Sequence, residues 1–244
     1  MISLLGVIFL LSVAVGLSSN RSAIRLRTVS LAFALQVTIG FVALFTDWGI
    51  AALGAASDYV SVLLSYSRTG MEFMFGGLVG SSDSLGFIFA FSVLPVIIFF
   101  SSLIAVLYHA RIMQWMIRIM GGGLRAILHT SHAESLSAAA NVFVGQAEAP
   151  LVARPYIPGM TRSELFAVMV GGMASIAGSV MAGYVALGVP LEYLLAASFM
   201  AAPGGLLMAK LIEPETDTPA EPQQGEKLNG EKYINLIDAA ATGA

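Results

Sequence analysis

Long apolar stretches alternate with short polar segments along most of this chain. Five stretches approach the ~20 mostly apolar residues that a membrane-spanning helix needs. They cover residues 1–19, 28–46, 84–110, 165–191 and 193–212. The last stretch contains the sequence APGG and, near its end, Lys210, whose long side chain can reach the membrane surface. The pattern predicts an all-α polytopic membrane protein with five transmembrane helices.

Two further segments are predicted to lie along the membrane surface as interfacial helices. Residues 48–82 are moderately apolar, but charged residues are spread along them, which favours a helix at the outer interface. Residues 111–130 are amphipathic, which suits a basic helix at the inner interface. Their polar side chains share one helical face: Arg111, Gln114, Arg118 and Arg125. An ordinary juxtamembrane anchor explains this second helix without any binding role.

The segment 134–160 predicts a different element. Its apolar part, between Glu134 and Glu148, is too short to cross a bilayer and suits a buried or re-entrant helix. Gly145 and Pro150 then interrupt the helix, and apolar residues follow the interruption. We therefore predict one re-entrant helical hairpin that turns between Gly145 and Pro150.

The carboxylate of Glu148 would lie close to that turn, at membrane depth. A charged group there costs at least about 2.5 kcal/mol on insertion scales, and ionisable residues inside membranes usually serve a function. Gln146 and Asn141 add amide groups nearby. The segment therefore suggests a site for a polar solute. An ion pair between Glu148 and Arg154 that merely fastens the hairpin is the structural alternative.

The fourth apolar stretch contains small residues at every fourth position. Such a row lets helices approach closely, and simple helix packing explains most of it. However, the sequence GGMASIAGS, residues 171–179, gathers glycine and serine at the middle of the stretch. This combination favours local unwinding, which frees carbonyl groups to hold a cation. A hairpin that faces a broken helix is typical of a secondary transporter.

Composition and charge narrow the class of protein. The chain has 244 residues, of which 57% are hydrophobic and 11% charged, whereas soluble domains carry roughly 25% charged residues. The net charge of −3 argues against nucleic acid as a partner. The sequence contains no cysteine and no phosphate-binding loop or hydrolase motif, and its histidines lack zinc-ligand spacing. We expect neither an enzyme nor a bound cofactor.

The arginines predict how the spans are oriented. They gather at 21–27, after the first predicted span, and at 111–162, after the third, and these two segments fall on the same side if the three spans alternate. Since positively charged loops stay in the cytoplasm, the N-terminus is expected outside the inner membrane.

At residues 141–184 the sequence NVFVGQAEAPLVARPYIPGMTRSELFAVMVGGMASIAGSVMAGY closely resembles the concentrative nucleoside transporter family. So do GVPLEYLLAASFMAAPGGLLMAKLIEPET, at 188–216, and the terminal NLIDAAATGA. The resemblance implies cation-coupled uptake of nucleosides, usually with sodium. It also implies a homotrimer in which a transport domain moves against a scaffold.

The resemblance further implies which residues form the binding site. Gln146 and Glu148 would contact the nucleobase, with Ala147 between them and Val180 packed against the base. The sodium site would use, largely through backbone carbonyls, Asn141, Val144, Ser175 and Ile176. The family commonly has threonine or serine where this chain has Ala147, so a hydroxyl is missing at the base. The preferred nucleoside therefore stays open.

Together these features predict four regions along the chain. Residues 1–130 form a scaffold-type region, and residues 131–213 a transport-type region with the hairpin 134–160 and helices at 164–188 and 191–212. Residues 214–232 are polar and proline-rich, which predicts a flexible cytoplasmic loop. Residues 233–244 are predicted to form the start of a truncated helix. A missing C-terminal half is expected to supply the ribose-binding residues.

The sequence allows two other interpretations. A truncated membrane module that interacts or regulates without transporting would account for the short chain. A proton in place of sodium, with Glu148 as its carrier, would account for the buried carboxylate.

Overall fold

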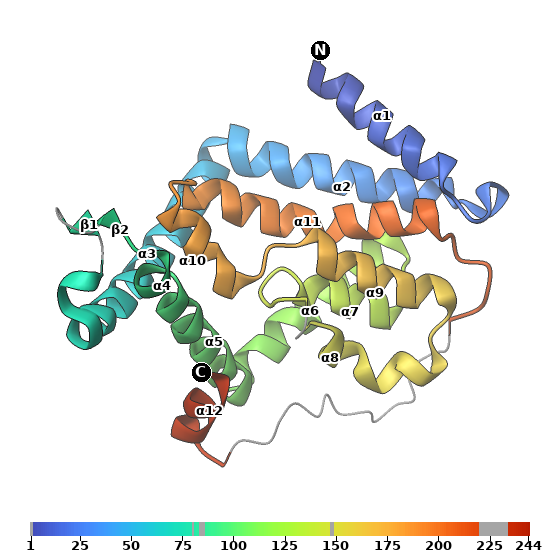
Figure 1. The fold of residues 1–244 in the computed structure, drawn as a ribbon. Helices are drawn as coiled ribbons and strands as arrows, with labels where there is room; N and C mark the ends of the chain where they lie inside the picture. Colours follow the sequence, from blue (N-terminus) through green and yellow to red (C-terminus); the bar gives the residue numbers. More distant parts are fainter. Residues whose placement is uncertain (1, 80, 83–85, 147–148, 220–233) are drawn as a thin grey trace.

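The computed structural model describes residues 2–79, 81–82, 86–146, 149–219 and 234–244. Within these ranges the chain is almost entirely helical (Figure 1). The N-terminal half contains α1 Ile2–Gly16, η1 Arg21–Ala23, α2 Leu26–Phe45, α3 Asp47–Phe75, η2 Gly76–Leu78, β1 Ser81–Ser82, β2 Gly86–Phe87, α4 Phe89–Ser92 and α5 Leu94–His109. The two-residue strands β1 and β2 pair antiparallel.

The second half contains the segment 134–160, which was predicted to form a hairpin, and the helices that pack around it. Its elements are α6 Ile112–Leu128, α7 His132–Ala140, α8 Ala149–Ala153, η3 Arg154–Gly159, α9 Arg162–Ala174, α10 Gly178–Ala186, α11 Leu191–Ile212 and α12 Leu236–Gly243. In Figure 1, α11 runs through the middle of the molecule, beside α2 on one side and α9 on the other.

Small residues at the centre of α11 allow this close packing. Gly204 faces the side-chain amide of Gln36 in α2, and Gly205 lies 3.5 Å from the Cα of Gly171 in α9, both measured from the position that a Cβ would occupy. The helix continues through Pro203, which is fully buried. The APGG sequence thus lets α11 pack tightly against a neighbour on each side.

Four helices of the described part are long and apolar enough to cross a membrane: Leu26–Phe45, Asp47–Leu78, Phe89–His109 and Leu191–Ile212. Three of them coincide with predicted spans. The helix at Leu4–Gly16 is apolar but shorter. The second of the four corresponds to the segment 48–82, which was predicted to lie at the outer interface, and its length and composition also allow it to cross the membrane.

The fourth predicted span is divided into two helices. α9 ends at Ala174 and α10 begins at Gly178, and Ser175 between them is extended, with φ −108° and ψ 159°. The predicted unwinding of GGMASIAGS is therefore confirmed. Because the helical hydrogen bonds stop here, backbone groups at the centre of this element are free to bind something else.

Local sequence explains where the helices of the second half begin. α7 and α9 both start with a capping box, in which the N-cap hydroxyl accepts from the N3 backbone amide and the N3 glutamate accepts from the N-cap amide. The pairs are Ser131 with Glu134 and Thr161 with Glu164. These boxes fix the starting points of the two helices that carry the candidate site.

Candidate functional site

The loop after α7 packs directly against the interruption between α9 and α10. A Cβ on Gly171 would lie 2.9 Å from Nδ2 of Asn141, and a Cβ on Gly172 would lie 3.2 Å from the Cβ of Gln146. A Cβ on Gly178 would overlap the carbonyl oxygen of Phe143. The backbones touch at Gly178, and the glycines at 171 and 172 leave room for the side chains of Asn141 and Gln146.

Asn141 lies at the C-terminal end of α7 and is fully buried, with 1% of its surface exposed. Its Nδ2 donates a hydrogen bond to the carbonyl oxygen of Ser137 over 3.0 Å. Its Oδ1 is buried and has no hydrogen-bond partner among the residues that the structure describes. An unpaired buried oxygen costs about 1–3 kcal/mol, so this acceptor is ready for a ligand.

Ser175 places a second such oxygen at the end of α9. Its Oγ is also buried, and no described residue forms a hydrogen bond with it. Val144, in the loop that follows Asn141, is fully buried, and Ile176 is half-buried in the interruption. An amide oxygen, a hydroxyl and backbone carbonyls are the hard oxygen ligands that suit Na⁺-type cations.

The residues predicted to bind a nucleobase are placed differently. Gln146 is exposed at the end of the loop, and Val180, in the first turn of α10, is 37% exposed. Both can therefore meet a solute. Ala147 and Glu148 lie outside the described residues, so their predicted roles stay predictions. Arg154, the alternative partner of Glu148, is exposed at the start of η3.

Three family models match most of the chain. The model described as the Na⁺ dependent nucleoside transporter N-terminus matches residues 5–78, and the corresponding C-terminus model matches residues 193–244. A model described as nucleoside recognition matches residues 90–191, which include the loop and the broken helix. The chain belongs to the family of concentrative, sodium-dependent nucleoside transporters.

Individual relatives match almost the whole chain. The chain is 57% identical to an uncharacterized transporter of Haemophilus influenzae over 242 residues, which is 99% of this chain and 58% of the relative. It is 47% identical to the nucleoside permease NupC of Helicobacter pylori over 246 residues, again 99% of this chain and 58% of the relative.

A solved structure shows the same fold. The inward-facing, substrate-bound state of CNTnw superposes with a TM-score of 0.90 at 55% identity, covering 99% of this chain and 57% of that one. The chain therefore spans just under three-fifths of the length of these members of the nucleoside transporter family.

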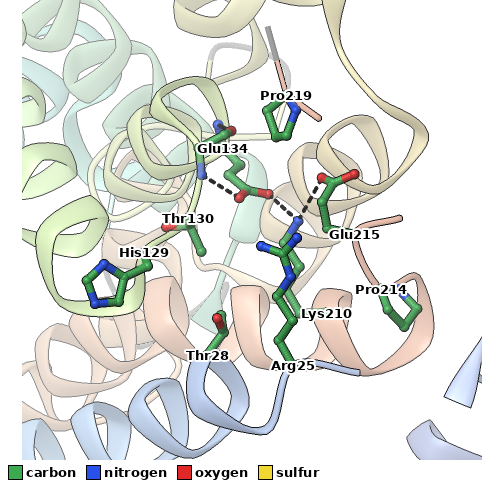
Figure 2. A pocket seen from close by; sticks show the side chains of 10 residues that line it. Arg25, Thr28, His129, Thr130, Glu134, Lys210, Pro214, Glu215 and Pro219 are labelled. Atoms are coloured by element: carbon green, nitrogen blue, oxygen red, sulfur yellow. Dashed lines mark hydrogen bonds and ion pairs between the residues drawn. The ribbon is translucent and has the colours of Figure 1, made fainter. Parts of the chain in front are cut away.

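A buried polar cluster that the sequence did not predict lies at the N-terminal ends of α7 and α9, whereas the candidate cation site lies at their C-terminal ends. Figure 2 shows the ammonium of Lys210 between the carboxylates of Glu134 and Glu215, in a pocket that Arg25 and Thr28 of the α2 region also line. Lys210 was expected to extend toward the membrane surface, but it points inward and is only 7% exposed.

The electrostatics of this cluster follow from its burial. Glu134 lies outside the helices long enough to span a membrane, and burial raises its pKa, although the nearby Lys210 ammonium works in the opposite direction. In the sequence, this cluster is signalled by Lys210, a charged residue within an apolar stretch. That position does not show which residues Lys210 contacts.

Proposed function

We propose that this chain forms the N-terminal part of a symporter that carries nucleosides together with Na⁺ across the inner membrane. One observation carries the proposal: where the loop after α7 meets the broken helix, Asn141 and Ser175 each present a buried oxygen that has no hydrogen-bond partner in the described part of the chain. Family membership supplies the substrate class, and the oxygen pair supplies a reason for coupling transport to a cation.

In this proposal the site has two adjoining parts. The cation is held by the amide oxygen of Asn141, the hydroxyl of Ser175 and backbone carbonyls at Val144 and Ile176. The nucleobase is contacted by the exposed end of the loop, through Gln146, Ala147 and Glu148, with Val180 against its face. The cation neutralises charge near the base, so each ligand favours binding of the other, which is the basis of coupled transport.

The segment 134–160 serves as a re-entrant hairpin. α7 has nine residues, too few to cross a bilayer, and the loop that follows meets the broken helix. Irregular backbone at membrane depth is tolerated where protein or a water-filled cavity surrounds it. Here the loop and the interruption cover one another.

The arginines support a membrane orientation for these helices. Arg21, Arg25 and Arg27 follow α1, and several more arginines follow α5. If α1, α2 and α5 cross the membrane and α3 lies at the outer interface, both basic segments reach the cytoplasm and the N-terminus lies outside. If α3 also crossed, the two basic segments would lie on opposite sides. With α9–α10 and α11, the proposal has five spans.

We also propose the division of labour within the protein. Residues 1–130 belong to the scaffold and residues 131–213 to the moving transport domain. Residues 214–232 form a cytoplasmic linker, whose first residues, Pro214 and Glu215, line the Lys210 pocket. In the complete transporter, a C-terminal half supplies the contacts to the ribose, and three copies assemble as a homotrimer in the bilayer.

Uptake into liposomes tests the proposed function. The full-length protein, reconstituted with a Na⁺ gradient, should take up uridine or adenosine, and Glu148→Gln should abolish uptake. Glu72→Gln is the matched control, because Glu72 is an exposed carboxylate that pairs with Arg68 across one helical turn. Uptake that follows a pH gradient and ignores Na⁺ would instead establish proton coupling. No uptake under either gradient would favour a membrane module that does not transport.

A further inference from the structure

Lys210 connects three separate segments of the chain through one ammonium group. Its Nζ lies 2.7 Å from Oε2 of Glu134, 2.9 Å from Oγ of Ser163 and 3.5 Å from Oε2 of Glu215. Glu134 is in the first turn of α7, Ser163 is in the first turn of α9, and Glu215 follows α11. Lys210, Glu134, Ser163 and Glu215 are all buried.

These contacts engage the groups that start the two helices. Oε1 of Glu134 accepts from the amide of Ser131 in the capping box of α7, over 2.7 Å. The hydroxyl of Thr161, which caps α9, donates to Oε2 of Glu215 over 2.9 Å. The hydroxyl of Ser163 donates to the carbonyl oxygen of Glu213 over 2.6 Å. The beginnings of α7 and α9 are therefore tied to the end of α11.

The other ends of the same two helices carry the candidate cation site. α7 has nine residues and ends beside Asn141, while α9 has 13 residues and ends beside Ser175. At 1.5 Å per residue, the helices are about 13 Å and about 20 Å long. Since helices of this length are stiff, fixing their starts also fixes how their ends meet.

Stability alone explains this arrangement poorly. Burying a lysine and two carboxylates costs desolvation energy, and apolar or neutral replacements of buried ion pairs are often equally stable. Such replacements lose the fixed geometry that charged hydrogen bonds impose on the groups they join. The buried charges thus point to a geometric role.

We propose that Lys210 is a positioning residue for cation binding. By tying the starts of α7 and α9 to α11, it holds Asn141 and Ser175 at the separation that a cation needs. This inference rests on the proposed function of that site, and Lys210 itself does not touch the cation.

The test compares variants of the full-length protein in liposomes. Lys210→Met alone leaves two buried carboxylates unpaired, so the informative variant combines Lys210→Met with Glu134→Gln and Glu215→Gln. We expect this triple variant to fold and to need about tenfold more Na⁺ for half-maximal uptake. Its maximal rate at saturating Na⁺ should change less than about threefold, because the nucleoside contacts are intact. Lys210→Arg, which keeps the charge, should recover part of the Na⁺ affinity.

The matched control removes a nearby ion pair that lies on the surface. Arg162 Nε is 3.2 Å from Oε1 of Glu213, and the Arg162 side chain is 82% exposed. Arg162→Gln should leave the Na⁺ dependence unchanged, because exposed pairs fix little geometry.

Hydrogen exchange gives a readout that does not depend on transport. The amides of residues 142–145 and 175–177 should exchange faster in the triple variant than in the wild-type protein or in Arg162→Gln. If wild-type protein moves no nucleoside, the proposed function fails, but this comparison still decides the role of Lys210. A folded triple variant with wild-type exchange and Na⁺ dependence would overturn the inference. So would a triple variant that cannot fold, because the charges would then serve stability.

Discussion

At the residue scale, two side-chain oxygens distinguish the candidate site from ordinary helix packing. Oδ1 of Asn141 and Oγ of Ser175 are buried and form no hydrogen bond within the described ranges of the chain. Leaving such acceptors unpaired lowers stability by about 1–3 kcal/mol each, so a cation that binds to both oxygens would restore stability. The sequence predicted both residues through a family resemblance, but only the packing shows that their oxygens are left without a partner.

Ser175→Ala should separate stability from cation binding. Removing the unpaired hydroxyl should leave the unfolding temperature in Na⁺-free buffer unchanged or raise it, because a buried unsatisfied group is lost. The further rise in unfolding temperature on adding Na⁺ should shrink, because one ligand is gone. Thermal unfolding of the full-length protein in detergent, with and without Na⁺, measures both effects.

Ser137→Ala is the control for that experiment. The Oγ of Ser137 is likewise buried without a partner, but it lies within α7, one turn before Asn141. This variant should keep the full response to Na⁺. An undiminished Na⁺ response in Ser175→Ala would exclude Ser175 from the cation site.

At the element scale, the contact between the loop after α7 and the broken helix was partly foreseeable. The cluster of glycine and serine predicted the break at residues 175–177, and Gly145 with Pro150 predicted an interruption in the hairpin. The tie between α7, α9 and α11 was not foreseeable. A sequence shows that Lys210 and Glu134 are charged, but not that two residues so far apart form one buried pair.

Gly171→Ala tests how closely these elements must approach. The added methyl group would lie 2.9 Å from Nδ2 of Asn141 and push its amide out of position. We expect half-maximal uptake to need about tenfold more Na⁺. The unfolding free energy should be lower by about 1–3 kcal/mol, as for overpacked cores. Uptake assays and thermal unfolding would show both effects.

Gly122→Ala in α6 is the control, because a Cβ at Gly122 has no neighbour within 4 Å. Within a helix this change should be neutral or add about 0.5–1 kcal/mol of stability. If Gly171→Ala behaved like this control, the close approach would have no functional consequence.

At the scale of the whole molecule, the hydrophobic pattern predicted the class of fold well but did not decide whether α3 crosses the membrane. The spans at α2, α5 and α11 stand out because they contain about 20 apolar residues with few charges. α3 has 29 residues and carries charges along its length, so composition suggested a surface helix while its length allows a span. Only the distribution of arginines favours one placement over the other.

Cysteine labelling tests the placement of α3, and the natural absence of cysteine makes the chain suitable for it. Ala52→Cys and Thr69→Cys place thiols at exposed positions near the two ends of α3. If α3 lies at the outer interface, both thiols react with an impermeant maleimide added outside right-side-out vesicles. Reaction of only one of the two would mean that α3 crosses the membrane and that the proposed orientation is wrong.

In the proposed mechanism, Asn141 and Ser175 couple cation binding to nucleoside binding. The most direct measurement is the affinity of the full-length protein for a panel of nucleosides as the Na⁺ concentration rises. For the wild-type protein, we predict that nucleoside affinity increases with Na⁺. For the double variant Asn141→Ala with Ser175→Ala, nucleoside affinity should no longer depend on Na⁺. The same Na⁺ dependence in both proteins, or none in the wild type, would contradict the claim.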